Sequence, residues 1–326
     1  MRRAAIFLVA CACSSSAPSG PSTPSDDAGA DAPASALPQT CARGAKNSAP
    51  VTTCNGAAAL CERTYDKVVV PMTHNAMSAS DESWSVPNQT HGLARQLADG
   101  IRGMMLDTKY YDVESSQNAP SKIEGVTTVD QIYLCHGPCA LGKTRLLDGL
   151  CALTRFLDEN PGEVLSVIFE NDVADPDTDE VLRASGLADY LYTHAPGTPW
   201  PTLREMIDGG KRLVVFVERG GGAPAHLHPA FEGNIWDTPY AFESQATFSC
   251  QKNRGATTSP LFLMNHWLSK PFGDIAYARE VNVAAVLGKR LEQCTTEAGR
   301  APTFVGVDFY EVGDLFAVVR AANGLP

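Results

Sequence analysis

The sequence predicts an α/β protein built as a TIM-type (β/α)8 barrel. Short apolar runs rich in β-branched residues recur along the chain, and stretches with helical periodicity lie between several of them. Polar or ionisable residues directly follow most of these runs. With 326 residues, of which 44% are hydrophobic, the chain is long enough for one large barrel with a sizeable core.

Eight strands are expected, seven of which are marked by clear apolar runs: 67–72, 101–107, 131–135, 164–169, 212–217, 261–265 and 303–308. The eighth falls within 234–243, where the apolar pattern is weak. Strands of this kind that alternate with helices favour a barrel. A doubly wound open sheet is the alternative, but residues 72–75 after the first strand do not form a glycine-rich phosphate loop.

Helical periodicity predicts helices between these strands, over 92–99, 145–159, 177–190, 202–208, 275–293 and 312–322. Asp177 and Thr178 offer N-cap chemistry for the third of them. The barrel is thus expected to occupy residues 67–326.

The N-terminus has the features of an export signal over residues 1–10. Arg2 and Arg3 precede an apolar run that is far too short to span a bilayer. The sequence around Cys11 resembles a bacterial lipobox, in which that cysteine is acylated, and an ordinary secretory signal is the alternative. No later apolar stretch has membrane-spanning length. We therefore expect an exported protein without a transmembrane helix, lipid-anchored at a cell-surface or periplasm-facing membrane or otherwise secreted.

Two segments precede the predicted barrel. Residues 11–40 are rich in Ser, Pro and Ala and cannot bury enough apolar surface to offset their ordering entropy, which predicts a disordered tether. Residues 41–66 contain three cysteines and little periodicity. This second segment is expected to be a lead-in that disulfides attach to the domain.

Ten cysteines fit an oxidising compartment. Without Cys11 and Cys13 of the signal region, eight remain and allow up to four disulfides: Cys41, Cys54, Cys61, Cys135, Cys139, Cys151, Cys250 and Cys294. The sequence does not choose among the possible pairings. A zinc site at 135–139 (Cys-His-Gly-Pro-Cys) is the alternative, although no second cysteine pair has matching spacing.

Seven predicted strands end in strongly hydrogen-bonding or ionisable residues: Thr73-His74-Asn75, Asp107, His136, Glu170-Asn171, Glu218-Arg219, Asn265-His266 and Asp308. In a (β/α)8 barrel these strand ends all lie at the face that carries the chemistry. Two histidines there can move protons to and from reacting oxygens, and two carboxylates with an amide suit a hard cation. The combination favours phosphodiester cleavage over acyl transfer, since no G-x-S-x-G motif is present.

Seven segments resemble, in order, the X domain of phosphatidylinositol-specific phospholipase C: 71–77 (PMTHNAM), 100–107 (GIRGMMLD), 134–136 (LCH), 161–170 (PGEVLSVIFE), 212–216 (RLVVF), 263–265 (LMN) and 307–310 (VDFY). The resemblance covers most of the chain and is greatest to exported proteins that consist of the X domain alone. It implies the phospholipase C-like barrel. It also implies cleavage of phosphatidylinositol or a related inositol phospholipid into diacylglycerol and a cyclic inositol phosphate.

The same resemblance implies roles for individual residues. His74 is the expected base that activates the inositol 2-hydroxyl, and that oxygen then attacks phosphorus. His136 is the expected acid that protonates the departing diacylglycerol oxygen. Asp308 is expected to orient His74. The residues themselves, and not the resemblance, suggest three substrate contacts. Lys109 and Arg219 are the cations nearest a phosphate or an inositol hydroxyl, with a solvated face as the alternative, and His266 either lines the site or packs in the core.

A calcium site is also implied, with Asn75, Asp107 and Glu170 as three ligands. Met105 stands where calcium-dependent members carry a glutamate ligand, so the site is incomplete. Calcium prefers six to eight oxygens, and water and substrate phosphate would have to supply the others. Loss of the metal, leaving a degenerate enzyme, is the alternative.

The expected partner is a phospholipid at a membrane surface, bound by a monomer. The net charge of −11 argues against nucleic acid, which requires a basic face. Two other functions remain open. One is a barrel phosphodiesterase for another head group, similar to sphingomyelinase D, and the other is a non-catalytic module that binds an inositol or glycan head group.

Overall fold

The computed structural model describes residues 39–270 and 272–326. The predicted signal peptide, Cys11, Cys13 and the tether up to residue 38 lie outside the described residues. In the described part, no helix combines the length and the apolar character needed to cross a membrane.

The described residues contain eight parallel strands that follow one another around a curled, barrel-type sheet in the order of the sequence. They are β1 (Val70–Thr73), β2 (Gly103–Asp112), β6 (Leu165–Asn171), β7 (Leu213–Val217), β8 (Leu227–Pro229), β9 (Ile235–Asp237), β10 (Leu261–His266) and β11 (Phe304–Val307). β11 pairs with β1, so the first and last strands meet. The hydrogen-bonded path begins at β8 and ends at β9, and the helical turn Ala230–Asn234 joins these two strands. The predicted α/β barrel is confirmed.

Seven of the eight predicted strand positions are barrel strands in the described structure, and one prediction is wrong. The run 131–135 forms β4 (Ile132–Leu134), which pairs antiparallel with the outer half of β2 and lies off the barrel path. The true fifth barrel strand, β8, was missed. It has only three residues, Leu-His-Pro, and therefore shows no apolar run.

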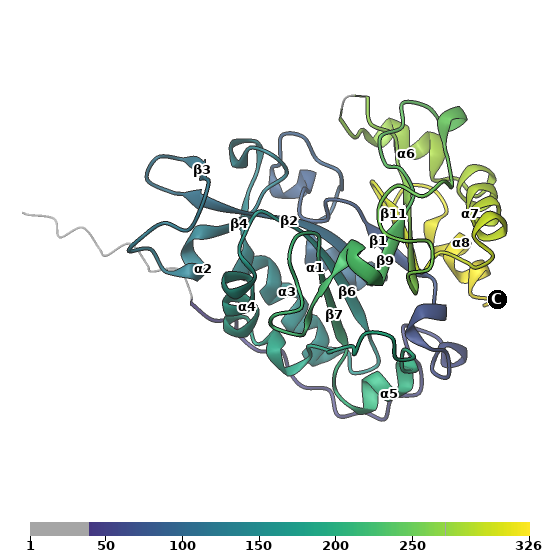
Figure 1. The fold of residues 1–326 in the computed structure, drawn as a ribbon, viewed down its shortest axis with the longest axis horizontal. Helices are drawn as coiled ribbons and strands as arrows, with labels where there is room; N and C mark the ends of the chain where they lie inside the picture. The colour runs from purple at the N-terminus through teal and green to yellow at the C-terminus, as the bar shows by residue number, and fades with distance from the viewer. Residues whose placement is uncertain (1–38, 271) are drawn as a thin grey trace, which may run out of the picture. The chain divides into compact units, whose positions relative to one another are not determined.

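β2 is long, and its outer half carries an arm beyond the barrel (Figure 1). β3 (Gln117–Ala119) and β4 both pair antiparallel with β2 there, and β5 (Thr144–Arg145) pairs with β4. The arm brings the residues that follow β4 back to the end of the barrel.

The helices lie close to their predicted positions, except for the short α2, which was not predicted. They are α1 (Leu93–Asp99), α2 (Thr128–Gln131), α3 (Leu146–Glu159), α4 (Asp175–Ala184), α5 (Leu203–Asp208), α6 (Ile275–Val281), α7 (Ala284–Ala298) and α8 (Leu315–Ala322). Short 3-10 turns are Ala58–Leu60, Tyr65–Lys67, Ser80–Glu82, Cys139–Leu141, Leu187–Asp189 and Gln245–Thr247.

Two helix predictions need correction. α4 begins at Asp175 after the N-cap Ala174, so Asp177 and Thr178 lie within the helix and not at its cap. The stretch predicted as one helix over 275–293 is two helices, because α6 ends at the C-cap Asn282. The Asn282 amide donates to the backbone oxygen of Asp308, which ties the break between the helices to the end of β11.

The strands separate two buried apolar clusters. On β7, Val214 and Phe216 belong to the cluster that also holds Ile168 and Met105, whereas Leu213, Val215 and Val217 pack with the helices. This alternation is the two-residue period of a strand that is buried on both faces. The first cluster fills the barrel interior and ends at the polar rim described below.

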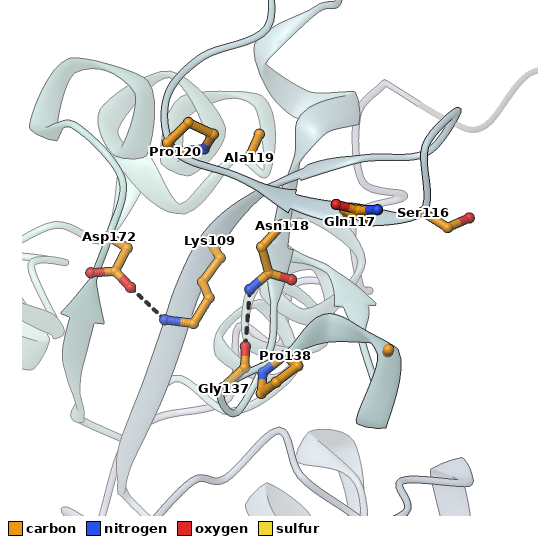
Figure 2. A pocket seen from close by; sticks show the side chains of 10 residues that line it. Lys109, Ser116, Gln117, Asn118, Ala119, Pro120, Gly137, Pro138 and Asp172 are labelled. Carbon is orange, nitrogen blue, oxygen red and sulfur yellow. Dashed lines mark hydrogen bonds and ion pairs between the residues drawn. The ribbon is translucent and has the colours of Figure 1, made fainter.

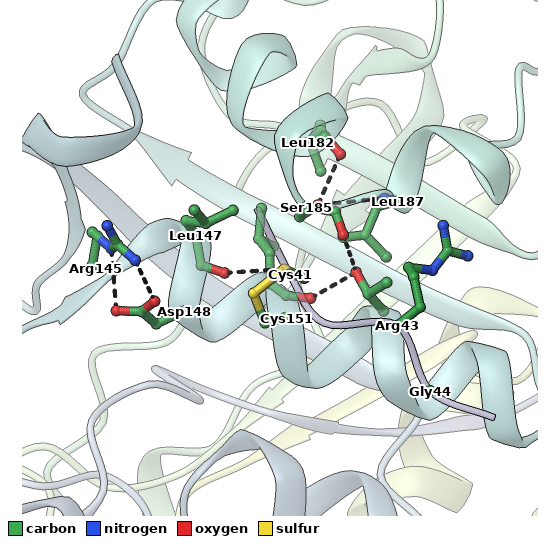
Figure 3. The surroundings of a disulfide bond; sticks show 12 residues. Cys41, Arg43, Gly44, Arg145, Leu147, Asp148, Cys151, Leu182, Ser185 and Leu187 are labelled. Carbon is green, nitrogen blue, oxygen red and sulfur yellow. Dashed lines mark hydrogen bonds and ion pairs between the residues drawn. A yellow bond between two sulfur atoms is a disulfide. The ribbon is translucent and has the colours of Figure 1, made fainter. Parts of the chain in front are cut away.

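All eight cysteines of the described region pair, as Cys41–Cys151, Cys54–Cys61, Cys135–Cys139 and Cys250–Cys294. The prediction of up to four disulfides is confirmed, and the zinc alternative is wrong because both sulfurs of residues 135 and 139 are bonded to each other. Figure 3 shows Cys41 of the lead-in bonded to Cys151 on α3. Arg43 strengthens this attachment through an ion pair of 2.6 Å with the buried Asp158.

Candidate active site

His74 and Asp308 are neighbours because β1 and β11 are paired. The register places Thr73 opposite Val307, so the residue that follows each strand lies at the same rim. His74 Nδ1 lies 2.8 Å from Asp308 Oδ1. A carboxylate only accepts hydrogen bonds, so Nδ1 carries the hydrogen and Nε2 remains available as a base. The imidazole also stacks on Trp267, with ring centroids 3.8 Å apart, which fixes its orientation.

Hydrogen bonds between side-chain amides connect Asp308 to Asn75 through Asn88. Asn88 Nδ2 donates to Asp308 Oδ2 at 3.1 Å, and Asn88 Oδ1 accepts from Asn75 Nδ2 at 3.2 Å. Because the carboxylate can only accept, the orientation of both amides is determined, and the Asn75 oxygen is left for another partner. Asn75 has φ of 44°, a left-handed conformation that asparagine tolerates better than most residues.

His136 reaches the same rim through the arm. Cys135 N donates to Asp107 O at 3.1 Å, and the Cys135–Cys139 disulfide closes the short loop that carries His136. The rings of His136 and His74 have centroids 6.5 Å apart. Burial lowers the pKa of His136 and the neighbouring His74 lowers it further, whereas Asp308 and Glu170 act in the opposite direction. The two predicted histidines are therefore brought together, although the route of the chain differs from the prediction.

Three carboxylates come from the neighbouring strands β2, β6 and β7: Asp107 and Glu170 lie within β2 and β6, and Glu218 follows β7. Asp107 is opposite Glu170 in the β2–β6 register, and Glu218 N donates to Phe169 O, which places Glu218 beside them. Asp107 is only 5% exposed. Burial raises its pKa well above the usual range, and Glu170 raises it further. Burial also raises the pKa of Glu218, against the effect of Arg254.

Arg254 lies at this rim, and the sequence analysis did not predict it. Ion pairs and aromatic rings hold its guanidinium in place. Its guanidinium pairs with Glu218 Oε2 at 2.9 Å and with the buried Asp237 Oδ2 at 2.7 Å, and it lies over the rings of Phe231 and Tyr240. It lies in the long connection between β9 and β10, which has no apolar periodicity. Nothing in the sequence pattern therefore marked it.

A pocket of about 230 Å³ gathers most of these groups, and its lining residues are His74, Asn75, Met105, Asp107, Ile168, Glu170, Glu218, Arg219, Tyr240, Arg254, Asn265 and Trp267. Five predicted site residues line it directly, while Asp308 and His136 adjoin it through His74. Lys109 lies at a neighbouring pocket, where it pairs with Asp172. Asp172 also pairs with Arg219.

His266 is a wrong prediction as a substrate-binding residue. Its side chain is fully buried, and Nε2 lies 2.9 Å from the backbone oxygen of Val281. Nδ1 faces the buried guanidinium of Arg290. Burial lowers the pKa of His266 to about 3. A neutral imidazole in this environment is a packing residue, because position 266 turns away from the pocket that position 265 lines.

The sequence model of the PI-PLC X family (PI-PLC X 1) matches residues 60–323. The chain belongs to the PI-PLC X domain family. Among its relatives, PI-PLC X domain-containing protein 1 of Arthroderma benhamiae is 28% identical, over 83% of this chain and 90% of the relative. A PI-PLC X domain-containing protein of Arabidopsis thaliana is 27% identical over 87% of this chain, and a secreted protein of A. benhamiae is 27% identical over 80%. The chain spans 66% and 61% of the length of these last two proteins.

Solved structures agree on the fold of this PI-PLC X protein. The phosphatidylinositol-specific phospholipase C of Listeria monocytogenes superimposes with a TM-score of 0.51 at 17% identity, covering 85% of this chain and 96% of that one. A Staphylococcus aureus enzyme of the same name gives a TM-score of 0.54 at 14% identity, covering 82% and 95%. These similarities establish the phospholipase C-type barrel.

The residues of this PI-PLC X barrel that could hold a cation are two carboxylates and one amide. Neither the Asp107 nor the Glu170 carboxylate has a hydrogen bond or an ion pair within the described residues, and the Asn75 amide oxygen is left for another partner by the chain through Asn88. No three His, Cys, Asp or Glu side chains in the described part gather closely enough to hold a metal. Asn75, Asp107 and Glu170 therefore offer oxygen atoms of the kind that a hard cation takes, but they do not form a complete site, and water or substrate would have to supply the other ligands.

Proposed function

We propose that this protein is a phospholipase C-like phosphodiesterase that cleaves phosphatidylinositol or a related inositol phospholipid. The observation that carries the proposal is the pair of imidazoles, His74 and His136, with ring centroids 6.5 Å apart at one rim of the barrel. One of them is oriented by a carboxylate at 2.8 Å. With a phosphodiester between two such rings, the attacking hydroxyl can lose its proton to one ring and the leaving oxygen can gain a proton from the other.

The proposed reaction is an attack of the inositol 2-hydroxyl on phosphorus. His74 Nε2 removes the hydroxyl proton, and Asp308 stabilises the imidazolium that forms. The new P–O bond closes a cyclic phosphodiester while the bond to the glycerol oxygen breaks. His136 in its protonated form gives its proton to that leaving oxygen, so the products are diacylglycerol and a cyclic inositol phosphate.

Asn75, Asp107 and Glu170 are the residues that would hold Ca²⁺ in this proposal. A bound calcium ion supplies positive charge to the non-bridging phosphate oxygens. Met105 lines the same pocket as a thioether that offers calcium no oxygen ligand, so the protein supplies few of the six to eight oxygens that the ion prefers. Arg254 and Arg219 line this pocket too, and Arg254 is already neutralised by Glu218 and Asp237.

The proposed setting is the surface of a membrane, reached by an exported protein that acts as a monomer. Lipid attachment at Cys11 belongs to the same proposal. Export is supported by the secreted relative and by the oxidising compartment that four disulfides require.

Phosphorus NMR of products from phosphatidylinositol micelles tests the activity. The wild type should release a cyclic inositol phosphate, and His74→Ala or His136→Ala should lower turnover by about 10²–10⁴-fold, as expected for general acid–base groups. His226→Ala is the matched control, because His226 pairs with Asp179 on α4 and lies outside the pocket. Normal turnover in both active-site variants would contradict the proposal. Tight binding of the head group without product would instead support the non-catalytic alternative.

A further inference from the structure

A second and larger pocket lies beside the candidate active site. Its volume is about 770 Å³, and it is lined by Lys109, Ser116, Gln117, Asn118, Ala119, Pro120, Gly137, Pro138, Ala140 and Asp172 (Figure 2). The arm supplies most of these residues, from the end of β2 through β3 to the loop after His136. The mechanism proposed above does not use this space.

The two pockets share the same strand faces. Side chains two residues apart on a strand point to the same side, so Asp107 and Lys109 of β2 follow one another along one face. Asp107 lines the smaller pocket and Lys109 the larger one. Glu170 and Asp172 repeat this step at the end of β6. Figure 2 shows the ion pair of Lys109 with Asp172, which closes one side of the larger pocket.

His136 stands at the boundary between the two pockets. The two residues that follow it, Gly137 and Pro138, line the larger pocket, whereas its ring approaches His74 of the smaller one. Glu170 of the smaller pocket raises the pKa of His136 and Lys109 of the larger pocket lowers it. Since His136 is the proposed donor to the leaving oxygen, the group that departs must extend to its far side, toward the larger pocket.

The lining of the larger pocket suits an uncharged ester. Ala119, Pro120, Pro138 and Ala140 offer apolar contact, and Ser116 and Gln117 supply hydrogen-bond donors. Lys109 and Asp172 neutralise each other, so the pocket carries no net charge from them. Near its lining residues in the sequence, Val113 is 60% exposed and Leu141, next to Ala140, is 37% exposed.

We propose that the larger pocket binds the acylglycerol leaving group, with the glycerol and its ester carbonyls against residues 116–120 and 137–140. The smaller pocket then holds the head group, and the phosphate lies between His74 and His136. This assignment rests on the proposed function. The Asn118 amide holds the two halves of the pocket together, because it donates to Gly137 O at 3.1 Å and accepts from Cys139 N at 2.9 Å.

Two soluble substrates with the same inositol phosphate but different leaving alcohols test the assignment. One carries dihexanoylglycerol and the other carries methanol. The wild type should prefer the first in kcat/KM by about 10–200-fold, the range for apolar contacts in a pocket. Ala140→Trp, which fills the pocket, should abolish this preference by lowering kcat/KM on the dihexanoylglycerol substrate more than on the methyl ester. Ala119→Trp is a second variant on the opposite wall, and Ala285→Trp, at an exposed position of α7, is the control.

A preference that survives in both pocket variants would overturn the assignment, and so would an equal loss on both substrates. Direct binding of dihexanoylglycerol, followed by NMR shifts, separates this inference from the proposed function. If the wild type cleaved neither substrate, the proposed function would be wrong. Binding that Ala140→Trp abolishes would still support the pocket, and binding that it leaves intact would overturn it.

Discussion

Asp107 and Glu170 lie opposite each other in the parallel register of β2 and β6, and neither carboxylate has an ion pair within the described residues. Burial and the neighbouring negative charge both raise the pKa of Asp107. Two adjacent carboxylates, one of them buried, cannot both ionise without cost. The relationship has consequences for stability, for metal binding and for pH dependence.

Asp107→Asn should stabilise the protein at neutral pH. The folded-state pKa of Asp107 is raised, so the folded protein holds this proton more tightly than the unfolded chain does. The associated stability is present below the unfolded value of about 4 and is lost as the pH rises through the folded value. The gain in Tm should therefore be large at pH 7 and vanish near pH 4. Thermal unfolding across this range measures it, with Asp208→Asn on the exposed end of α5 as control.

Calcium should raise the Tm of the wild type. Binding to the folded state alone adds about 2.7 kcal/mol when the free ion is at 100 times its Kd. Asp107→Asn and Glu170→Gln should both remove the shift, because each takes one carboxylate from the pair. Glu218→Gln should keep it, since Glu218 is already paired with Arg254. An undiminished shift in the first two variants would place the ion elsewhere, and the absence of any shift in the wild type would remove calcium from the proposal.

The position of His136 shows what the sequence could and could not predict. Its type and its place after an apolar run correctly predicted a histidine beside His74 at the barrel rim. The run itself was wrongly taken as a barrel strand, because a buried antiparallel strand and a buried parallel strand have the same apolar composition. His136 nevertheless lies at the predicted rim, because β4 pairs with the half of β2 that follows Asp107 and so ends there.

Arg254 and Asn88 could not be predicted from pattern. Both lie outside the regular elements, and their roles depend on partners far away in the sequence, namely Glu218 and Asp237 for the first and Asp308 for the second. A search for polar residues at the ends of predicted strands finds side chains that the barrel itself places at the rim. It does not identify residues that long loops bring to the rim.

His136→Ala should lose most activity on an alcohol leaving group and little on p-nitrophenolate. A good leaving group needs no proton, so the variant should lose about 10²–10⁴-fold on an alkyl ester but far less on the activated ester. Burial and His74 lower the pKa of His136. The fall of kcat/KM at high pH should therefore begin below the ordinary imidazole value of about 6.5, and it should disappear in the variant. Equal losses on both esters would contradict an acid role.

Asn88→Ala should weaken catalysis and metal binding together. The variant removes one hydrogen bond to the Asp308 carboxylate and frees the Asn75 amide to rotate. A hydrogen bond to a charged group contributes about 1.5–3 kcal/mol, so kcat should fall by roughly 10–100-fold. The calcium-induced shift in Tm should shrink in the same variant, which a purely structural role would not require. Asn234→Ala is the control, because among the residues that the structure describes that amide bonds only to Pro229 O. A calcium-induced shift in Tm of normal size in Asn88→Ala would contradict the proposed link between Asn88 and the metal site.

The disulfide Cys135–Cys139 should matter for turnover more than for stability. It closes residues only 4 apart, which the chain-entropy relation values at about 2 kcal/mol, against about 4.7 kcal/mol for a loop of about 100 residues such as Cys41–Cys151. Replacing both cysteines of the short loop by serine should lower kcat, because the His136 ring is no longer held toward His74.

The pair Cys54–Cys61 supplies the matched control for that variant. It also closes a short loop, with a separation of 7, and its cysteines are equally buried, but it lies in the lead-in away from both histidines. Its removal should lower Tm by a similar amount and leave kcat unchanged. Removal of Cys41–Cys151 should cause the largest loss of Tm. Thermal unfolding and steady-state kinetics on the three double variants compare these effects. If the loss of Cys135–Cys139 changed Tm alone, the loop would not be what positions the acid.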